Sequence, residues 1–176
     1  MEILIYPNQA LRSKATSIAT SARAIYDSDI EKAYLLMDQM ITAMQKNNGL
    51  GLAATQVGEC LRMFVFNSEM LNKTICMINP DIIWCDGKSL EEEACLSIPG
   101  FAAKVERAAV IGVKYYDIHQ GMEISRLFGG RDARVIQHEI DHLDGILYID
   151  HLSSLKRQMF KRKYAKLQKL NKINKY

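Results

Sequence analysis

The chain has 176 residues, a hydrophobic content of 48% and a formal net charge of +3, which together suit one compact domain and exclude a chain disordered throughout. No apolar run approaches the length needed to span a membrane, and no basic segment followed by an apolar one opens the sequence, so we expect a cytoplasmic protein that does not bind membranes. Four cysteines without a dense spacing pattern indicate a reducing compartment.

The first predicted element is an amphipathic helix that begins near Ser28 and ends at residues 47–49. Residues 28–31 resemble a capping box, in which Ser28 and Glu31 satisfy free backbone N–H groups of the first turn. Apolar side chains then recur at helical spacing along one face, formed by Ile30, Ala33, Tyr34, Met37, Ile41 and Met44. We expect this face to pack into the core.

Strands and a second helix are predicted in the middle of the chain. Stretches rich in β-branched and aromatic residues predict strands at residues 63–67, 74–79, 81–85 and 109–118, followed by a turn at 119–121 and a strand at 122–125. A second helix is expected from about Asp132 to Leu143, with Gly145 as its stop. This order predicts an α+β fold, with mixed or antiparallel β-sheets around the second helix.

The second helix carries the most informative stretch of the chain, the sequence QHEIDH at residues 137–142. Because His138 and His142 are four residues apart, both imidazoles lie on one helical face and can reach a single metal ion. Glu139 lies between them, where it can take a proton from water bound to the metal. This pattern is typical of metal-dependent hydrolases.

The motif leaves the third protein ligand open. Tyr148 occupies the position where a metzincin needs its third His, and no Glu follows Glu139, so the usual ligand of thermolysin-like enzymes is missing. The third ligand is therefore expected upstream. Cys95 is the best candidate, because it lies in a polar-to-apolar transition that ends in Pro-Gly, whereas Cys60, Cys76 and Cys85 have apolar or strand-like surroundings. The alternative is that Cys95 is a small buried hydrophobic residue.

The last predicted element is a basic C-terminal helix. Residues 153–176 contain nine Lys or Arg and no acidic residue, so the total of +3 leaves −6 for residues 1–152. Residues 153–154 offer an N-cap, and Phe160, Tyr164 and Leu167 recur at helical spacing. Two interpretations stay open, a solvated helix and a helix that binds RNA phosphates. Residues beyond about Leu167 are expected to be disordered in the free protein.

Three ordered motifs resemble those of peptide deformylases. They are GLGLAATQ at residues 49–56, EACLS at 93–97 and QHEIDH at 137–142, and the resemblance extends from about residue 3 to about residue 155. The glycine spacing in the first motif is not a dinucleotide fingerprint, because the glycines follow a helical segment instead of linking a strand to a helix.

The resemblance implies a domain organisation, an activity and partners. Residues 1–152 would form the catalytic domain, and residues 153–176 a basic helical tail of the same domain. The enzyme would remove the N-formyl group from the N-terminal formylmethionine of newly synthesised polypeptides. Its cofactor would be one divalent metal ion, most often Fe2+, with Zn2+, Ni2+ or Co2+ as alternatives. Its partners would be N-formylmethionyl nascent peptides and, through the tail, the ribosome.

The resemblance also implies a role for each site residue. The metal ligands would be Cys95, His138 and His142, with Glu139 as general base and then general acid. The oxyanion would be stabilised by the Gln56 side-chain amide and the Leu96 backbone N–H. An extended peptide would pair with Gly49, Leu50 and Gly51, and an apolar pocket beside His138 would receive the Met side chain. Independently of the resemblance, hydrogen bonds from Glu93, Arg107 and Asp141 are expected to orient the ligands. The alternative is that each of these three residues forms an ordinary surface ion pair.

Two positions depart from the family pattern. Ala94 stands where the family commonly has Gly, and its methyl group could crowd the substrate backbone. Residues 128–134 are more polar than expected near a pocket for Met. Three other functions therefore stay in view: a metal-dependent amidohydrolase for another acyl group, a non-enzymatic peptide-binding or ribosome-associated protein, and an endopeptidase.

Overall fold

The computed structural model of the chain describes residues 1–20 and 28–169. The helices and strands follow in this order: η1 Gln9–Arg12, α1 Ser28–Lys46, β1 Gly51–Ala53, η3 Ala54–Val57, β2 Met63–Ser68, β3 Lys73–Asp86, β4 Ser89–Cys95, β5 Ile98–Arg107, β6 Val110–Asp117, β7 Met122–Gly129, α2 Gly130–Leu143, η4 Tyr148–His151 and α3 Ser154–Lys169. Of the residues beyond Leu167 that we expected to be disordered, Gln168 and Lys169 belong to α3. Residues 170–176 lie outside the described part, as does the side chain of the expected cap Ser28.

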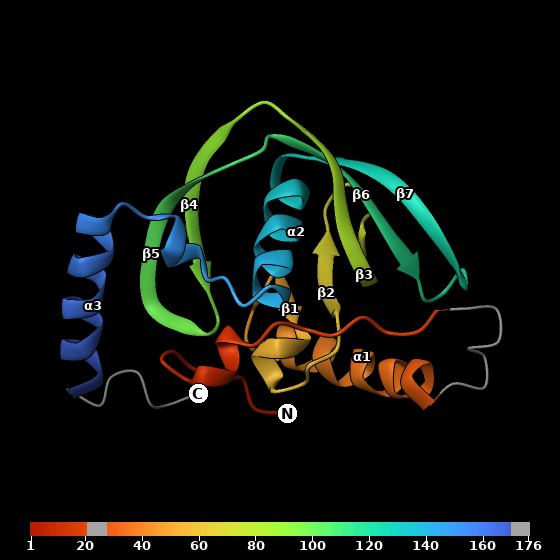
Figure 1. Ribbon diagram of the computed structural model, residues 1–176, viewed down its shortest axis with the longest axis horizontal. Helices are drawn as coiled ribbons and strands as arrows, with labels where there is room; N and C mark the ends of the chain where they lie inside the picture. The colour runs from red at the N-terminus through yellow and green to blue at the C-terminus, as the bar shows by residue number, and fades with distance from the viewer. Residues whose placement is uncertain (21–27, 170–176) are drawn as a thin grey trace.

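The described strands form two antiparallel sheets. One contains five strands in the order β1-β2-β3-β6-β7, and the other is the hairpin of β4 and β5. Figure 1 shows α2 at the centre, with the hairpin on one side and β2, β3, β6 and β7 on the other. The prediction of an α+β fold with antiparallel sheets around this helix is confirmed.

Three groups of buried side chains hold these layers together. The inner faces of α2 and the large sheet form one group, which includes Phe64, Phe66 and Ile136. A second group joins α1 to the same sheet through residues such as Met40 and Met44. No helix in the described part of the chain has the length and apolarity needed to cross a membrane.

The third group lies under the C-terminal helix. Phe160 and Tyr164 of α3 are each 1% exposed and share a core cluster with Cys95 of β4. The Ser153 side chain accepts a hydrogen bond from the backbone N–H of Lys156, as expected of an N-cap. The prediction of a helix with Phe160 and Tyr164 on its buried face is therefore confirmed.

Several strand predictions were wrong in detail. Residues 74–79 and 81–85 belong to one strand, β3, in which the register shifts between Ile78 and Asp81 and Asn79 adopts a φ of 49°. Pro80, which lies between the two predicted strands, is thus part of a bulge inside one continuous strand. The short β1 was not predicted, because glycines open it, and β4 and β5 were missed because the run of glutamates at 91–93 resembles a loop.

Candidate metal centre

The structure brings together the three side chains predicted to bind a metal. His138 and His142 project from one face of α2, and Cys95 is the last residue of β4. The Cys95 Sγ lies 3.1 Å from His142 Nε2, and one potential ligand atom from each of the three residues lies within 4.8 Å of the others. All three residues are buried. This spacing is compatible with one ion bound at distances of about 2.0–2.3 Å.

The electrostatics of the two histidines also fit a metal ion. Burial alone would lower the pKa of His138, but hydrogen bonds with Cys95 and Glu93 outweigh it and raise the pKa well above its usual value. Burial and the nearby His138 lower the pKa of His142. The site therefore favours one positive charge beside the thiol and keeps His142 neutral. One sulfur and two imidazole nitrogens form a donor set that both Fe2+ and Zn2+ accept.

Glu93 holds His138 in place. Its Oε2 lies 3.0 Å from His138 Nδ1, while Arg107 donates two hydrogen bonds to the carboxylate and Arg134 donates a third. Burial alone would raise the pKa of Glu93, but the hydrogen bonds with His138 and Arg107 outweigh it and lower the pKa to about 2. Glu93 is thus a fixed anion that orients the ring of a candidate ligand.

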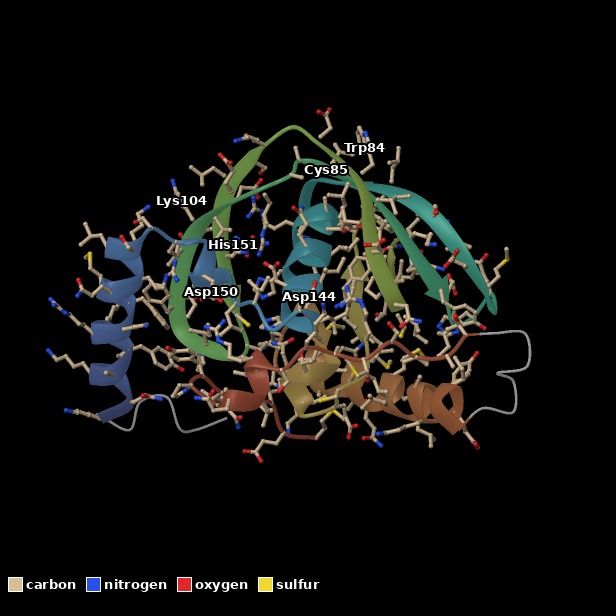
Figure 2. All side chains as sticks on the ribbon, in the orientation of Figure 1. Trp84, Cys85, Lys104, Asp144, Asp150 and His151 are labelled. Atoms are coloured by element: carbon tan, nitrogen blue, oxygen red, sulfur yellow. The ribbon has the colours of Figure 1, made fainter. Side chains whose placement is uncertain are left out.

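Arg107 extends this network to the surface. Its Nη1 donates to Asp141 at 2.5 Å, and His151 lies 2.7 Å from the same carboxylate oxygen. Figure 2 labels His151 in η4. Arg134 and His151 were not singled out in the sequence. The position of Arg134 four residues before His138 is a signal that could have found it, whereas nothing in the sequence pairs His151 with Asp141.

Gln56, which was predicted to stabilise the oxyanion, lies beside Cys95. Its Oε1 accepts a hydrogen bond from the backbone N–H of Ala53, which turns the amide nitrogen toward Cys95 Sγ at 3.5 Å and Ser97 Oγ at 3.1 Å. Leu96 lines the same pocket. Ser97 belongs to the second sequence motif, but its contact with Gln56 was not predicted.

Glu139 is 3% exposed and packs against Gly51. A Cβ atom at Gly51 would lie 2.8 Å from the Glu139 Cδ. Burial raises the pKa of the carboxyl to about 7, against the opposing effect of His138. Its Oε2 has no hydrogen-bond partner among the described residues. An acid with a pKa close to neutrality and a free buried oxygen is suited to transfer a proton to or from a bound molecule.

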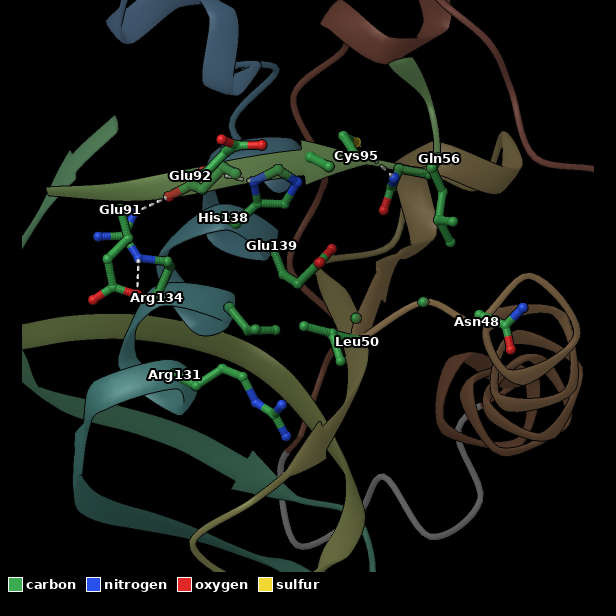
Figure 3. A pocket seen from close by; sticks show the side chains of 16 residues that line it. Asn48, Leu50, Gln56, Glu91, Glu92, Cys95, Arg131, Arg134, His138 and Glu139 are labelled. Carbon is green, nitrogen blue, oxygen red and sulfur yellow. Dashed lines mark hydrogen bonds and ion pairs between the residues drawn. The ribbon is translucent and has the colours of Figure 1, made fainter. Parts of the chain in front are cut away.

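A pocket of about 490 Å³ opens beside these residues (Figure 3). Gly49, Leu50 and Gly51 line it from one side and β4 from the other, and two of the three candidate metal ligands, Cys95 and His138, line the same pocket. Ala94 also lines the pocket, and its φ is not positive, so the backbone there tolerates a side chain. The wall is more polar than an apolar Met pocket, because it includes Glu91, Glu92, Arg131 and Arg134.

Comparison with known proteins agrees with these observations. Residues 1–158 match the family described as polypeptide deformylase. A peptide deformylase of Thermodesulfovibrio yellowstonii is 42% identical over 167 residues, which cover 93% of this chain and 96% of the relative. Another, from Stenotrophomonas maltophilia, is 43% identical over 170 residues, 96% of each chain. The crystal structure of a peptide deformylase from Legionella pneumophila has a TM-score of 0.82 at 35% identity and covers 99% of this chain and 98% of its own. This chain belongs to the peptide deformylase family.

Proposed function

We propose that this chain removes the formyl group from the N-terminal formylmethionine of newly synthesised polypeptides. The observation that carries the proposal is the convergence of Cys95, His138 and His142 beside the buried Glu139, in a chain of the peptide deformylase family. The three residues would hold one divalent ion, with Fe2+ favoured by the family resemblance and Zn2+, Ni2+ or Co2+ accepted by the same donors. When bound, this ion supplies positive charge that polarises the formyl carbonyl and lowers the pKa of water.

Glu139 and Gln56 perform the remaining chemistry in this proposal. Glu139 takes a proton from the attacking water as the new C–O bond forms, and returns it to the nitrogen as the C–N bond breaks. Formate and a free amine leave. The Gln56 amide, whose orientation is fixed by Ala53, donates a hydrogen bond to the carbonyl oxygen as negative charge develops, together with the Leu96 backbone N–H.

The peptide would bind between two free strand edges. β1 is the terminal strand of the large sheet, and β4 pairs only with β5 among the described strands. Both line the pocket. An extended peptide placed between them gains main-chain hydrogen bonds that do not depend on its sequence. This arrangement explains why Gly49, Leu50 and Gly51 are proposed as substrate-binding residues.

Formyl peptides are expected to react faster than acetyl peptides by about tenfold to 100-fold, because an added methyl group must fit between Gln56, Cys95 and Glu139, all of which are buried. The measurement compares kcat/KM for formyl-Met-Ala-Ser and acetyl-Met-Ala-Ser with anaerobically prepared, iron-loaded protein. Equal rates would favour a different amidohydrolase, cleavage of an internal peptide bond would favour an endopeptidase, and binding without turnover would favour a peptide-binding protein.

Gly51→Ala is expected to lower kcat/KM by about 100-fold, because the new methyl group displaces the Glu139 carboxylate from the reacting atoms. The measurement is steady-state deformylation, with metal content determined on the same samples. Gly129→Ala is the matched control, since a Cβ there meets no atom closer than 3.8 Å. A Gly51→Ala enzyme as active as the control would show that Glu139 does not need its present position.

The basic helix is proposed as a contact with the ribosome. Six cationic side chains of α3 are exposed, namely Lys156, Lys161, Arg162, Lys163, Lys166 and Lys169, while Phe160 and Tyr164 hold the helix on the rest of the domain. A row of cations on an anchored helix gains affinity for RNA phosphates through release of counterions. Residues 1–152 then act as the catalytic part and residues 153–176 as its basic tail, in the cytoplasm where nascent chains are made.

A further inference from the structure

The pocket carries a guanidinium group at the end that is remote from Cys95. Along α2, Val135 and Arg131 precede His138 by three and seven residues, so all three lie on one helical face and Arg131 is about 10 Å along the axis from His138. Figure 3 shows Leu50 between Cys95 and Arg131. A side chain that leaves the reacting centre therefore passes the apolar Val135 and Leu50 before it approaches Arg131.

The position of Arg131 is set by the turn that follows β2. Its Nε lies 3.3 Å from the Glu69 carboxylate. The backbone N–H groups of Glu69 and Met70 donate to Asp132 at 2.9 and 3.2 Å, and the Ser68 hydroxyl donates to the same carboxylate at 2.5 Å. Because Asp132 belongs to the first turn of α2, these contacts keep Glu69 beside Arg131 and hold the guanidinium at the pocket.

Arg131 also has hydrogen-bonding capacity to spare. Within the described part of the chain, its two terminal nitrogens make no hydrogen bond, and its side chain is 49% exposed. Arg134 is different, because its terminal nitrogens donate to Glu93, to the Val105 carbonyl and to Ser89. Of the two arginines that line the pocket, Arg131 is the one available to a ligand.

We infer that Arg131 is a specificity-determining residue that lets this pocket accept formylated peptides whose first residue is methionine sulfoxide. The inference rests on the proposed function, in which the first residue is always methionine, so that oxidation is the change that adds an oxygen acceptor to its side chain. A thioether sulfur accepts hydrogen bonds weakly. The sulfoxide oxygen is strongly polar, and its transfer into a wholly apolar pocket would oppose binding. Hydrogen bonds from the terminal N–H groups of Arg131 to the sulfoxide oxygen compensate for the hydration that this oxygen loses in the pocket.

The test compares kcat/KM for formyl-Met-Ala-Ser, its sulfoxide and the norleucine analogue, which has a similar shape without a heteroatom. The wild-type protein is expected to turn over the sulfoxide within about tenfold of the Met peptide, and Arg131→Leu to lower the sulfoxide value by about tenfold or more, mainly through KM. In this variant the ratio of the Met value to the norleucine value is expected to stay within about threefold of wild type, while the ratio of the sulfoxide value to the norleucine value falls. Arg131→Lys, which keeps a donor, is expected to recover part of the loss.

Lys114→Leu is the matched control, because Lys114 is also a half-exposed cation in a surface ion pair, 3.2 Å from Glu123, and lies outside the pocket. A wild-type enzyme that deformylates the Met peptide but rejects the sulfoxide would overturn the inference alone. An equal loss for all three peptides in Arg131→Leu would overturn it as well. Failure to turn over formyl-Met-Ala-Ser would overturn the proposed function and the inference together.

Discussion

Glu139→Gln is expected to lower kcat by about 10²–10⁴-fold, the contribution typical of a general acid–base group, while the protein keeps its metal and its fold. Glutamine has nearly the same shape and fills the space beside Gly51, but it cannot take a proton from water and return it to the amine. Because Glu139 Oε2 is buried and has no partner among the described residues, removal of its charge should not destabilise the domain.

The measurement combines steady-state deformylation with metal analysis and thermal unfolding of the same samples. Glu123→Gln serves as the control, since Glu123 lies on β7 with a side chain that is 62% exposed. A Glu139→Gln enzyme that keeps kcat within about threefold of wild type would assign the proton transfer to another group. Loss of metal in that variant would instead mean that Glu139 helps to hold the ion.

Arg107→Met is expected to lower the free energy of unfolding by about 3–5 kcal/mol, because it leaves the buried Glu93 carboxylate and Asp141 without their main cationic partner. The Arg107 side chain is 5% exposed and that of Glu93 is 4% exposed, so water replaces little of the lost interaction. Arg134 still contacts Glu93, which places the expected loss at the lower end. Metal affinity should fall by about 10- to 100-fold as His138 loses its fixed orientation.

Denaturant unfolding of the metal-free protein and metal titration of the folded protein measure these two effects separately. The double variant Arg107→Met with Glu93→Gln is the informative control, because it removes the buried charge together with its partner. The double variant should be more stable than the Arg107→Met protein if the loss comes from an unpaired carboxylate. If Arg107→Met lowered the free energy of unfolding by less than about 1 kcal/mol, the buried ion pair of Arg107 and Glu93 would contribute little to stability, contrary to the prediction.

The sequence predicted those elements of the structure in which residues of one kind recur at regular spacing along a short segment. Apolar spacing found α1 and the buried face of α3, and the four-residue spacing of His138 and His142 placed both on one face of α2. Elimination among distant residues then led to Cys95, and the structure places its sulfur 3.1 Å from His142. The helix predictions succeeded because helical periodicity is a property of short segments. The assignment of Cys95 as a metal ligand stays a prediction.

The hairpin of β4 and β5 was missed for a reason that concerns the site itself. A strand is recognised by alternation of polar and apolar residues, but one of the two buried residues of β4 is charged. This residue is Glu93, which is buried by its contacts with Arg107, Arg134 and His138. Because the interior of the site is polar, the alternation of polar and apolar residues that identifies a strand is absent from β4. The approach of Gly51 to Glu139 likewise depends on how β1 packs against α2, which no local spacing reveals.

The shared core of α3 and β4 has a consequence for the design of shortened proteins. Phe160 and Tyr164 pack in the same cluster as Cys95, so deletion of the helix removes apolar contacts from the strand that carries a candidate metal ligand. Loss of activity in a truncated protein would therefore not show that the helix binds RNA. Reversal of charge at Lys161 and Lys166, which are exposed, would change the electrostatic surface while the aromatic anchors stay in place. The positive charge of this helix and its packing against the domain can therefore be tested separately only by substitution of single side chains.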